Sequence, residues 1–426
     1  MTFQGAIQAH GNPAGWPEVE LRSVVRQRKE FEQPDLPLLG VSVASGVRPR
    51  TTDDGRQAAS LDLSAYKVVH PGDVIMNALG KPHGSIGVST TAGVTSPAYW
   101  VLEVSGEVSR FVHYLLRSPH MVNEYQRLGK YLPPNQFDIP WETFRSVAIP
   151  LPGLDEQRRI ADFLDDQVSR IDAITEASKG QISLLDERVA EAILSAVRGD
   201  DMPDQGTWSG LRWLGNVPES WPVLTVGSQF EVLLGKMLDE KRNDGTQSVP
   251  YLRNTNVQWD RVNVDDLKEM DIAPAERHRF LVRRGDLLIC EGGQPGRAAI
   301  WTGPCEEIYY QKALHRARTR GRSLPRWLFY CLRAAVGMNA FAGENGQTTI
   351  GHLTSEQLRG QRLPFPAPSV QGTIVAALDA YQDEAKHLVA ALSWRIKFLQ
   401  ERKGALITAA VTGEFDVSTA SGRNFA

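Results

Sequence analysis

The fold of this 426-residue chain is decided by the stretch Pro150-Leu-Pro-Gly-Leu-Asp-Glu-Gln157-Arg-Arg-Ile160-Ala-Asp-Phe-Leu164-Asp165, because the chain repeats it. The second copy is Pro364-Phe-Pro-Ala-Pro-Ser-Val-Gln371-Gly-Thr-Ile374-Val-Ala-Ala-Leu378-Asp379. The same offset continues without a gap as far as Gly199 in the first copy and Gly413 in the second. Self-similarity of this length indicates a tandem duplication.

Shorter matches extend the duplication upstream of both copies. Pro71-Gly72-Asp73 corresponds to Arg284-Gly285-Asp286, and Phe111-Val-His-Tyr114 corresponds to Trp327-Leu-Phe-Tyr330. Trp16-Pro17 and Trp221-Pro222 stand near the start of each half. We therefore predict an α+β protein with an internal pseudo-two-fold repeat. Its expected parts are a variable domain over 1–150, a long helix over 151–199, a second variable domain over 200–363, a second helix over 364–413 and a loose tail over 414–426.

Both long segments have apolar residues at alternating spacings of three and four, which is typical of a coiled-coil contact face. The expected contact positions are Ile171, Ile182, Leu185 and Val189 in the first helix, and Leu378, Tyr381, Leu388 and Leu392 in the second. At about 1.5 Å per residue, some forty residues make a rod of roughly 60 Å, too long for one domain to cover. The alternative is two unrelated surface helices, but the gapless repeat favours an antiparallel coiled coil of the two.

Composition excludes several classes of protein. The 47 Lys and Arg residues nearly balance the 50 Asp and Glu residues, so net charge alone does not indicate a nucleic-acid partner. The stretch 151–199 is acidic, which favours protein over DNA as its partner. No apolar run is long enough to span a bilayer, and the three cysteines are too scattered for a disulfide framework. We expect a cytoplasmic protein that does not contact membranes.

Catalytic motifs are missing from the sequence. Pro133-Pro134-Asn135-Gln136-Phe137 contains the residue types of an adenine methyltransferase motif in the wrong order. No phosphate-binding loop of an ATPase and no convincing metal-ligand spacing is present. Glu401-Arg402-Lys403 resembles part of a nuclease site, but it lies on the second predicted helix, where an exposed surface explains it better. We predict no catalytic residue, no metal site and no cofactor in this chain.

Two sequence signatures resemble the specificity subunits of type I restriction–modification systems. The first is the repeated stretch that begins at Pro150, and the second is Tyr251-Leu-Arg-Asn-Thr-Asn256-Val-Gln followed by Arg283-Arg-Gly-Asp286-Leu-Leu-Ile-Cys-Glu-Gly-Gly293. The resemblance implies that each variable domain recognises one half of a split, asymmetric double-stranded DNA target. It implies that the helices set the gap between the halves and bind two methyltransferase subunits. S-adenosylmethionine, ATP and Mg²⁺ are then expected on the methyltransferase and the motor–nuclease subunits.

Basic and amide side chains are the candidates for DNA contact, since they pair with phosphates and base edges. Arg316, Arg318 and Arg320 alternate, so they share one face of an extended segment. The alternative for them is a solvated charged strand, and the amide residues could equally cap turns. The candidates in the second domain are Arg253, Asn254, Asn256, Gln258, Lys312, His315, Arg316, Arg318, Arg320, Gln347 and Thr348. Those in the first are Arg48, Arg50, Lys81, His83, Lys130, Tyr131, Asn135 and Gln136.

Two other functions are compatible with the pattern. A coiled-coil adaptor with two protein-binding heads would show the same helices but no salt-dependent DNA binding. The second alternative is the specificity module of a fused methyltransferase–nuclease system. It would have the same helices as the binding site for its methyltransferase, so the sequence does not distinguish it.

Overall fold

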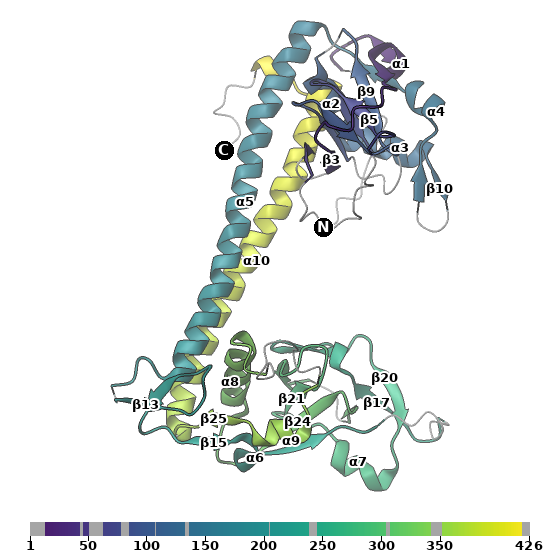
Figure 1. Ribbon diagram of the computed structural model, residues 1–426. Coiled ribbons are helices and arrows are strands. Elements are labelled where there is room, and N and C mark those ends of the chain that lie inside the picture. The colour runs from purple at the N-terminus through teal and green to yellow at the C-terminus, as the bar shows by residue number, and fades with distance from the viewer. Residues whose placement is uncertain are drawn as a thin grey trace. The chain divides into compact units, whose positions relative to one another are not determined.

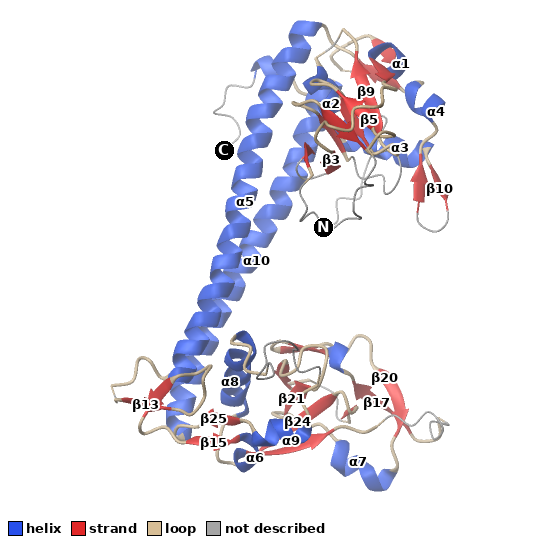
Figure 2. Cartoon of the chain, viewed as in Figure 1, coloured by secondary structure: helices blue, strands red, loops and turns tan. Residues whose placement is uncertain are grey.

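The computed structural model describes residues 13–42, 46–50, 63–77, 85–106, 108–132, 136–203, 205–237, 245–303, 307–341 and 352–419. The chain forms two compact units. Unit 1 consists of Met1–Lys179 and Ser393–Ala426, and unit 2 consists of Gly180–Leu392. Each unit therefore contains one mixed domain with parts of both long helices, and Figure 2 shows helices beside sheets in both.

The sheet at the centre of unit 1 has four antiparallel strands in the order β2-β9-β6-β7. Helix α2 lies against the sheets of this domain (Figure 1), and in the central sheet it contacts β7. The elements of this domain are β1 (Glu18–Glu20), α1 (Leu21–Val24), β2 (Val25–Gln27), β3 (Leu39–Ser42), β4 (Gly46–Pro49), β5 (Lys67–Val69), β6 (Val74–Met76), β7 (Ile86–Val88), β8 (Gly93–Thr95), β9 (Trp100–Val104), α2 (Ser109–Arg117), α3 (Pro119–Leu128), β10 (Lys130–Leu132), β11 (Gln136–Asp138), α4 (Trp141–Arg145) and β12 (Ala148–Pro150).

Unit 2 repeats this topology, with a four-stranded antiparallel sheet in the order β16-β24-β21-β22 and α8 against it. Its elements are β13 (Gly206–Trp208), β14 (Asn216–Pro218), β15 (Val223–Thr225), α6 (Val226–Gln229), β16 (Phe230–Leu234), β17 (Ser248–Leu252), η2 (Asn254–Asn256), β18 (Val257–Gln258), β19 (Arg261–Val262), β20 (Lys268–Asp271), α7 (Pro274–Phe280), β21 (Leu287–Cys290), β22 (Ala298–Ile300), β23 (Tyr309–Tyr310), β24 (Leu314–Thr319), α8 (Pro325–Gly337), α9 (Ser355–Gly360) and β25 (Arg362–Pro364). The duplication seen in the sequence is therefore a duplication of the fold.

The duplicated glycines Gly72 and Gly285 both lie in a turn that leads into a buried strand. Gly72 precedes β6 with a φ of 94°, and Gly285 precedes β21 with a φ of 90°. Only glycine adopts this region without strain. The aspartate that follows each glycine is buried and accepts a hydrogen bond from a main-chain N–H three residues earlier, Asp73 from His70 and Asp286 from Arg283.

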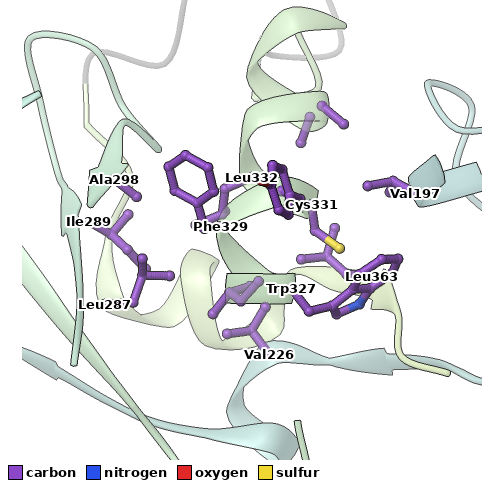
Figure 3. Packing of buried hydrophobic residues seen from close by; sticks show 14 of the residues in the cluster. Val197, Val226, Leu287, Ile289, Ala298, Trp327, Phe329, Cys331, Leu332 and Leu363 are labelled. Atoms are coloured by element: carbon purple, nitrogen blue, oxygen red, sulfur yellow. The ribbon is translucent and has the colours of Figure 1, made fainter. Parts of the chain in front are cut away.

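Unit 2 has a large apolar core between its sheet, α8 and the long helices. Phe329 of α8 lies beside Leu287 and Ile289 of β21, whereas Trp327 of the same helix lies beside Leu363 (Figure 3). All five side chains are fully buried. The core also contains Val189, Ile193 and Val197 from the first long helix and Leu378 and Ala385 from the second. The domain and the helices therefore share one core, so α8 is fixed on the helices by burial.

The two long helices are antiparallel, as predicted. Helix α5 runs over Leu154–Arg198 and α10 over Pro368–Thr412. In unit 1, Lys403 of α10 lies 2.7 Å from the carboxylate of Asp172 in α5. In unit 2, the end of α5 shares the core with the beginning of α10. The early part of each helix thus meets the late part of the other.

The predicted contact face is correct for α5 but displaced in part of α10. Ile171 and Val189 are buried, and Ile182 and Leu185 are partly buried. On α10, Leu378 is buried and Leu392 partly buried, whereas Tyr381 and Leu388 are 38% and 47% exposed. The next residue along, Gln382 or Val389, takes the contact position in each case. From Leu378 onward the contact residues of α10 still alternate at spacings of four and three. The first spacing after Leu378 is four, whereas the predicted first spacing was three.

The end of each long helix packs against the beginning of a domain. Gly199 and Gly413 have φ values of 78° and 76°. A Cβ built on Gly199 would lie 3.0 Å from the Trp221 ring, and one on Gly413 would lie 3.3 Å from the Trp16 ring. The duplicated tryptophans therefore pack at the two helix ends, together with Pro218 at Gly199 and Ala14 at Gly413.

The prediction of a loose tail from residue 414 is wrong for its first part. Phe415 packs on Phe163 of α5, with ring centroids 5.6 Å apart. Val417 is buried in the short helix η3 (Val417–Thr419). The sequence 414–419 looks polar, but its two apolar side chains are enough to attach it to unit 1. Residues 420–426 lie outside the described part of the chain.

Candidate nucleic-acid interface

Five loops of unit 2 meet at one edge of the domain, and we call them the loop cluster. It consists of 235–237, 253–256, 291–294, 311–313 and 352–354. Main-chain contacts connect them: Gln311 N–H donates to Leu252 O over 3.1 Å, and Glu291 N–H donates to Ala313 O over 3.0 Å. Isolated bridges pair Lys236 with Gln311 and Gly292 with His352. The sheet and α9 thus hold loops from distant parts of the sequence in fixed relative positions.

Glycine is required where two of these loops cross. A Cβ on Gly235 would lie 2.2 Å from the carbonyl oxygen of Gln311, so no other residue fits without movement of the backbone. Gly293 has a φ of 75° beside the Asn254 side chain. Close main-chain approach and a left-handed turn are the two reasons for which glycine is kept at such positions. The Gly-Gly pair that forms part of the sequence resemblance is therefore a structural part of the cluster.

The exposed polar groups of the loop cluster are those that can contact a ligand. Lys312 and His352 are exposed, as are Gly293 and Gln294, and Asn254 is partly exposed. Lys236 is partly buried and pairs with Glu276 over 2.6 Å. An exposed lysine can neutralise a phosphate, and amide groups can pair with base edges. This combination fits a nucleic-acid contact surface.

Arg316 and Arg318 share one face of β24, as predicted, but this face is inside the protein. Arg316 is 2% exposed, and its Nη1 donates to the carbonyl oxygens of Arg279 and Leu281 over 3.1 and 2.9 Å. Arg318 donates from Nε and Nη2 to the two carboxylate oxygens of Asp286, each over 2.7 Å. This hydrogen bonding raises the pKa of the Arg318 guanidinium.

The predicted phosphate contact by these two arginines is therefore corrected. Their donors face carbonyls and a buried carboxylate, because β24 is the second strand of a sheet that has α7 and the following loop over one face. Arg320, one residue beyond the strand, is exposed and stays a candidate. Alternation along a strand identifies residues on one face, but not whether that face is covered.

His315 is likewise an interior residue. It is fully buried, and its Nε2 lies 2.6 Å from the carbonyl oxygen of Leu353. The Ser355 hydroxyl lies 3.3 Å from Nδ1. Burial lowers the pKa of the imidazole, so the ring is neutral at neutral pH. His315 connects β24 to the loop before α9, and its buried ring is not exposed for the DNA contact that the sequence predicted.

The amide residues after β17 form a turn. Of the two interpretations of these residues, base contact or a role in turns, the structure thus favours the second. Asn256 is 3% exposed; its Oδ1 accepts from the Arg253 main-chain N–H, and its Nδ2 donates to Asn263 O over 3.0 Å. Arg253 itself donates to the carboxylate of Asp266 over 2.7 Å. Base contact by Asn256 is therefore corrected to a structural role. Gln258 is exposed, and with Asn254 it stays a candidate.

The other predicted contact residues are distributed as follows. Arg48 is exposed at the end of β4, and Arg50 is partly exposed with its side chain against Gly40. Lys130, Tyr131 and Gln136 belong to the β10–β11 hairpin. Lys81, His83, Asn135, Gln347 and Thr348 lie outside the described residues.

Sequence reasoning did not include Lys236, Gln294 and His352 among the candidates. Lys236 and Gln294 could have been found from the sequence, because each directly follows a glycine that the loop cluster requires, Gly235 or Gly293. Nothing in the sequence around His352 distinguishes it. Its place in the cluster depends on a bridge to Gly292, about sixty residues away, and only the tertiary structure supplies it.

Two features are absent from the described part of the chain. Within the ranges given above, no three His, Cys, Asp or Glu side chains come together in a way that could hold a metal ion. In the same ranges, no helix is both long enough and apolar enough to cross a membrane.

A duplicated α+β domain packed on two long antiparallel helices defines the class of fold to which this chain belongs. Residues 218–393 match the family model described as the type I restriction modification DNA specificity domain, so this similarity lies in the second half of the chain. The EcoKI specificity subunit of the type I restriction enzyme of Escherichia coli (strain K12) is 24% identical over 257 residues. That match covers 57% of this chain and 52% of the relative, about half of its length.

Two solved structures have the same fold over nearly the whole chain. One comes from a study of complex assembly and conformational transition of the type I R-M system, with a TM-score of 0.73, 17% identity, and coverage of 95% of this chain and 100% of that chain. The other is the HsdS subunit from Thermoanaerobacter tengcongensis, with a TM-score of 0.55, 18% identity, and coverage of 96% and 99%. The chain is therefore similar to type I specificity subunits in sequence and in fold.

Proposed function

We propose that this chain is the DNA-specificity subunit of a type I restriction–modification complex. In this role each domain recognises one half of a split, asymmetric double-stranded target. The observation that carries the proposal is the duplication of one domain on paired antiparallel helices. Two diverged copies of a DNA-binding domain suit two half-sites of different sequence. The loop cluster of unit 2, with Lys312, Asn254, Gln294 and His352, supports a contact with one half-site.

The partners and cofactors of the complex form part of the proposal. Two methyltransferase subunits bind the helices and supply S-adenosylmethionine, and motor–nuclease subunits supply ATP and Mg²⁺ chemistry. The chain itself recognises DNA and does not catalyse a reaction. We expect it to act in the cytoplasm, where the DNA is.

An exposed aromatic pair on α10 supports the proposed binding of methyltransferase subunits to the helices. Trp394 and Phe398 are 67% and 47% exposed, and their rings stack at 5.5 Å with an angle of 9° between the planes. Large exposed aromatic side chains are enriched at protein interfaces and often dominate the binding energy. We expect Trp394→Glu to reduce co-purification of the methyltransferase subunit by at least tenfold. Lys397→Glu, on the same exposed stretch, is the matched control and should reduce it little.

The proposed function is tested by expressing the chain with the methyltransferase encoded beside it and mapping methylated adenines across the genome. We expect a split asymmetric motif that disappears when the chain is deleted. Lys312→Ala should lower the occupancy of this motif without altering it. Methylation that does not depend on the chain, together with DNA binding that does not depend on salt, would overturn the proposal in favour of a protein adaptor.

A further inference from the structure

Unit 2 has a run of basic residues between α7 and β21 that includes none of the predicted DNA-contact residues. The stretch Arg277-His-Arg-Phe-Leu-Val-Arg-Arg-Gly285 contains four arginines and one histidine but no acidic residue. Four of its basic side chains are exposed, and we call them the basic strip: His278, Arg279, Arg283 and Arg284. All four belong to unit 2, so the strip does not depend on how the two units are arranged.

The first copy of the domain forms the same turn without these charges. Gly72 and Gly285 align, and both have positive φ values. The aspartate that follows each glycine accepts a hydrogen bond from the main-chain N–H three residues earlier. Unit 1 has Tyr66, His70 and Pro71 at the positions of Arg279, Arg283 and Arg284. The fold of the turn therefore does not require the three arginines.

Stabilisation of α7 explains only part of the basic strip. Attraction between a cation and the carboxyl end of a helix would account for His278 and Arg279, which lie in the last turn of α7. It would not account for Arg283 and Arg284, because the helix ends at Phe280. A polyanionic ligand accounts for all four residues.

Two interior arginines of β24 hold the main chain of the strip in place. Arg316 donates from Nη1 to the carbonyl oxygens of Arg279 and Leu281 over 3.1 and 2.9 Å. Arg318 donates from Nη2 to the carbonyl oxygen of Leu281 over 3.2 Å. The two arginines that the sequence assigned to phosphate contact thus support a segment whose own arginines are exposed. A surface held in this way loses less conformational entropy when it binds a ligand.

The basic strip adjoins the loop cluster. Lys236 of the cluster pairs with Glu276 of α7 over 2.6 Å, and its Nζ lies 5.7 Å from the centroid of the Phe280 ring. Asp286, at the other end of the strip, pairs with Arg318 over 2.7 Å. Both carboxylates that border the strip in the sequence therefore have cationic partners of their own. A polyanion that contacts the loop cluster meets positive charge at the edge of the cluster.

We infer that the basic strip binds the phosphate backbone of double-stranded DNA beside the bases that the loop cluster contacts. The inference rests on the proposed function, because the loop cluster must contact DNA for the strip to act beside it. Arginine is always charged and can donate two parallel hydrogen bonds to a phosphate. Phosphate contacts carry no sequence information, so the strip supplies affinity and does not alter the target.

The test compares the full native chain with a double variant, Arg283→Ala and Arg284→Ala. Binding to a labelled duplex of scrambled sequence is measured by fluorescence anisotropy over a series of salt concentrations. We expect the slope of log K against log salt to fall by about 2, because two phosphate contacts are lost. At about 0.15 M salt this corresponds to a loss of affinity of roughly 30-fold. The methylated motif mapped across the genome should stay the same.

Two further double variants separate a local contact from other effects. Arg283→Lys with Arg284→Lys keeps the charge and should keep the slope, since counterion release depends on charge. Arg212→Ala with Arg362→Ala removes the same charge from exposed positions of unit 2 outside the strip, and it should leave the slope unchanged.

Four results would overturn the inference. An unchanged slope in the Arg283 and Arg284 alanine variant, with salt-dependent binding by the native chain, would do so and leave the proposed function intact. An equal loss in the Arg212 and Arg362 variant would assign the effect to net charge. A changed methylated motif would mean that the strip contacts bases. Absence of salt-dependent DNA binding by the native chain would overturn the inference and the proposed function together.

Discussion

The hydroxyl of Tyr114 in α2 donates a hydrogen bond of 2.7 Å to a carboxylate oxygen of Asp165 in α5. The duplication places Tyr330 and Asp379 at the corresponding positions, and they form the same hydrogen bond. An arginine accompanies each pair, Arg110 in unit 1 and Arg326 in unit 2. Each domain is thus attached to the beginning of the helix that follows it by the same three residue types.

Removal of this hydroxyl should loosen the domain from the helix. We expect Tyr114→Phe to lower the free energy of unfolding of unit 1 by about 1 kcal/mol, less than is usual for a bond to a charged group because Asp165 is partly in water. Tyr330→Phe should have a similar effect in unit 2. Urea unfolding followed by circular dichroism measures both. Tyr381→Phe, at an exposed tyrosine, is the control. Equal stability of the Tyr114 and Tyr330 variants and the native chain would show that the pairs do not support the attachment.

Arg316 should matter for stability and not for the salt dependence of DNA binding. Arg316→Ala leaves two carbonyl oxygens and Glu231 without their cation, so we expect a loss of roughly 3 kcal/mol or more. Lys312→Ala and Arg320→Ala, at exposed residues, provide the comparison. Each substitution should reduce the slope of log K against log salt by about 1 if the residue contacts a phosphate. A reduced slope for a correctly folded Arg316→Ala variant, with unchanged slopes for the other two, would reverse this assignment.

The stability of unit 1 should fall in weak acid because of His113. The unfolded imidazole binds a proton below about pH 6.5, whereas burial lowers the pKa of the folded one to about 4. Between these values the unfolded state holds more protons, so the contribution is present above pH 6.5 and is lost as the pH falls. We expect a loss of about 2 kcal/mol between pH 7 and pH 5. His113→Phe should flatten the pH profile, measured by urea unfolding at both pH values. A profile that keeps its slope in this variant would assign the effect to other groups.

A lysine introduced at either of two positions tests which residues of the long helices form the contact face. Val189 is 6% exposed in the core of unit 2, so Val189→Lys should lower the free energy of unfolding by about 3 kcal/mol or more. Leu388→Lys changes a residue that is 47% exposed and should cost less than about 0.5 kcal/mol. Thermal unfolding of the full chain compares them. Similar losses for the two variants would restore Leu388 to the contact face predicted from spacing.

The sequence by itself determined the duplication, the two long helices and their antiparallel pairing. Repeats and heptad spacings are local patterns, and their physical cause, burial of one helix face, acts within a few turns. The turn glycines Gly72 and Gly285 could be predicted for the same reason, since the turn and its strands are adjacent in the chain.

Only the tertiary structure decided which polar residues are available for contact. Arg316, His315 and Asn256 have the residue types of a DNA-binding surface, yet each is buried by segments distant in the sequence. The loop cluster and the Tyr–Asp pairs likewise come from residues brought together across about fifty residues or more. The choice between Tyr381 and Gln382 at the helix contact also depends on the partner helix. Residue type fixes what a side chain can do, whereas long-range packing determines what it meets.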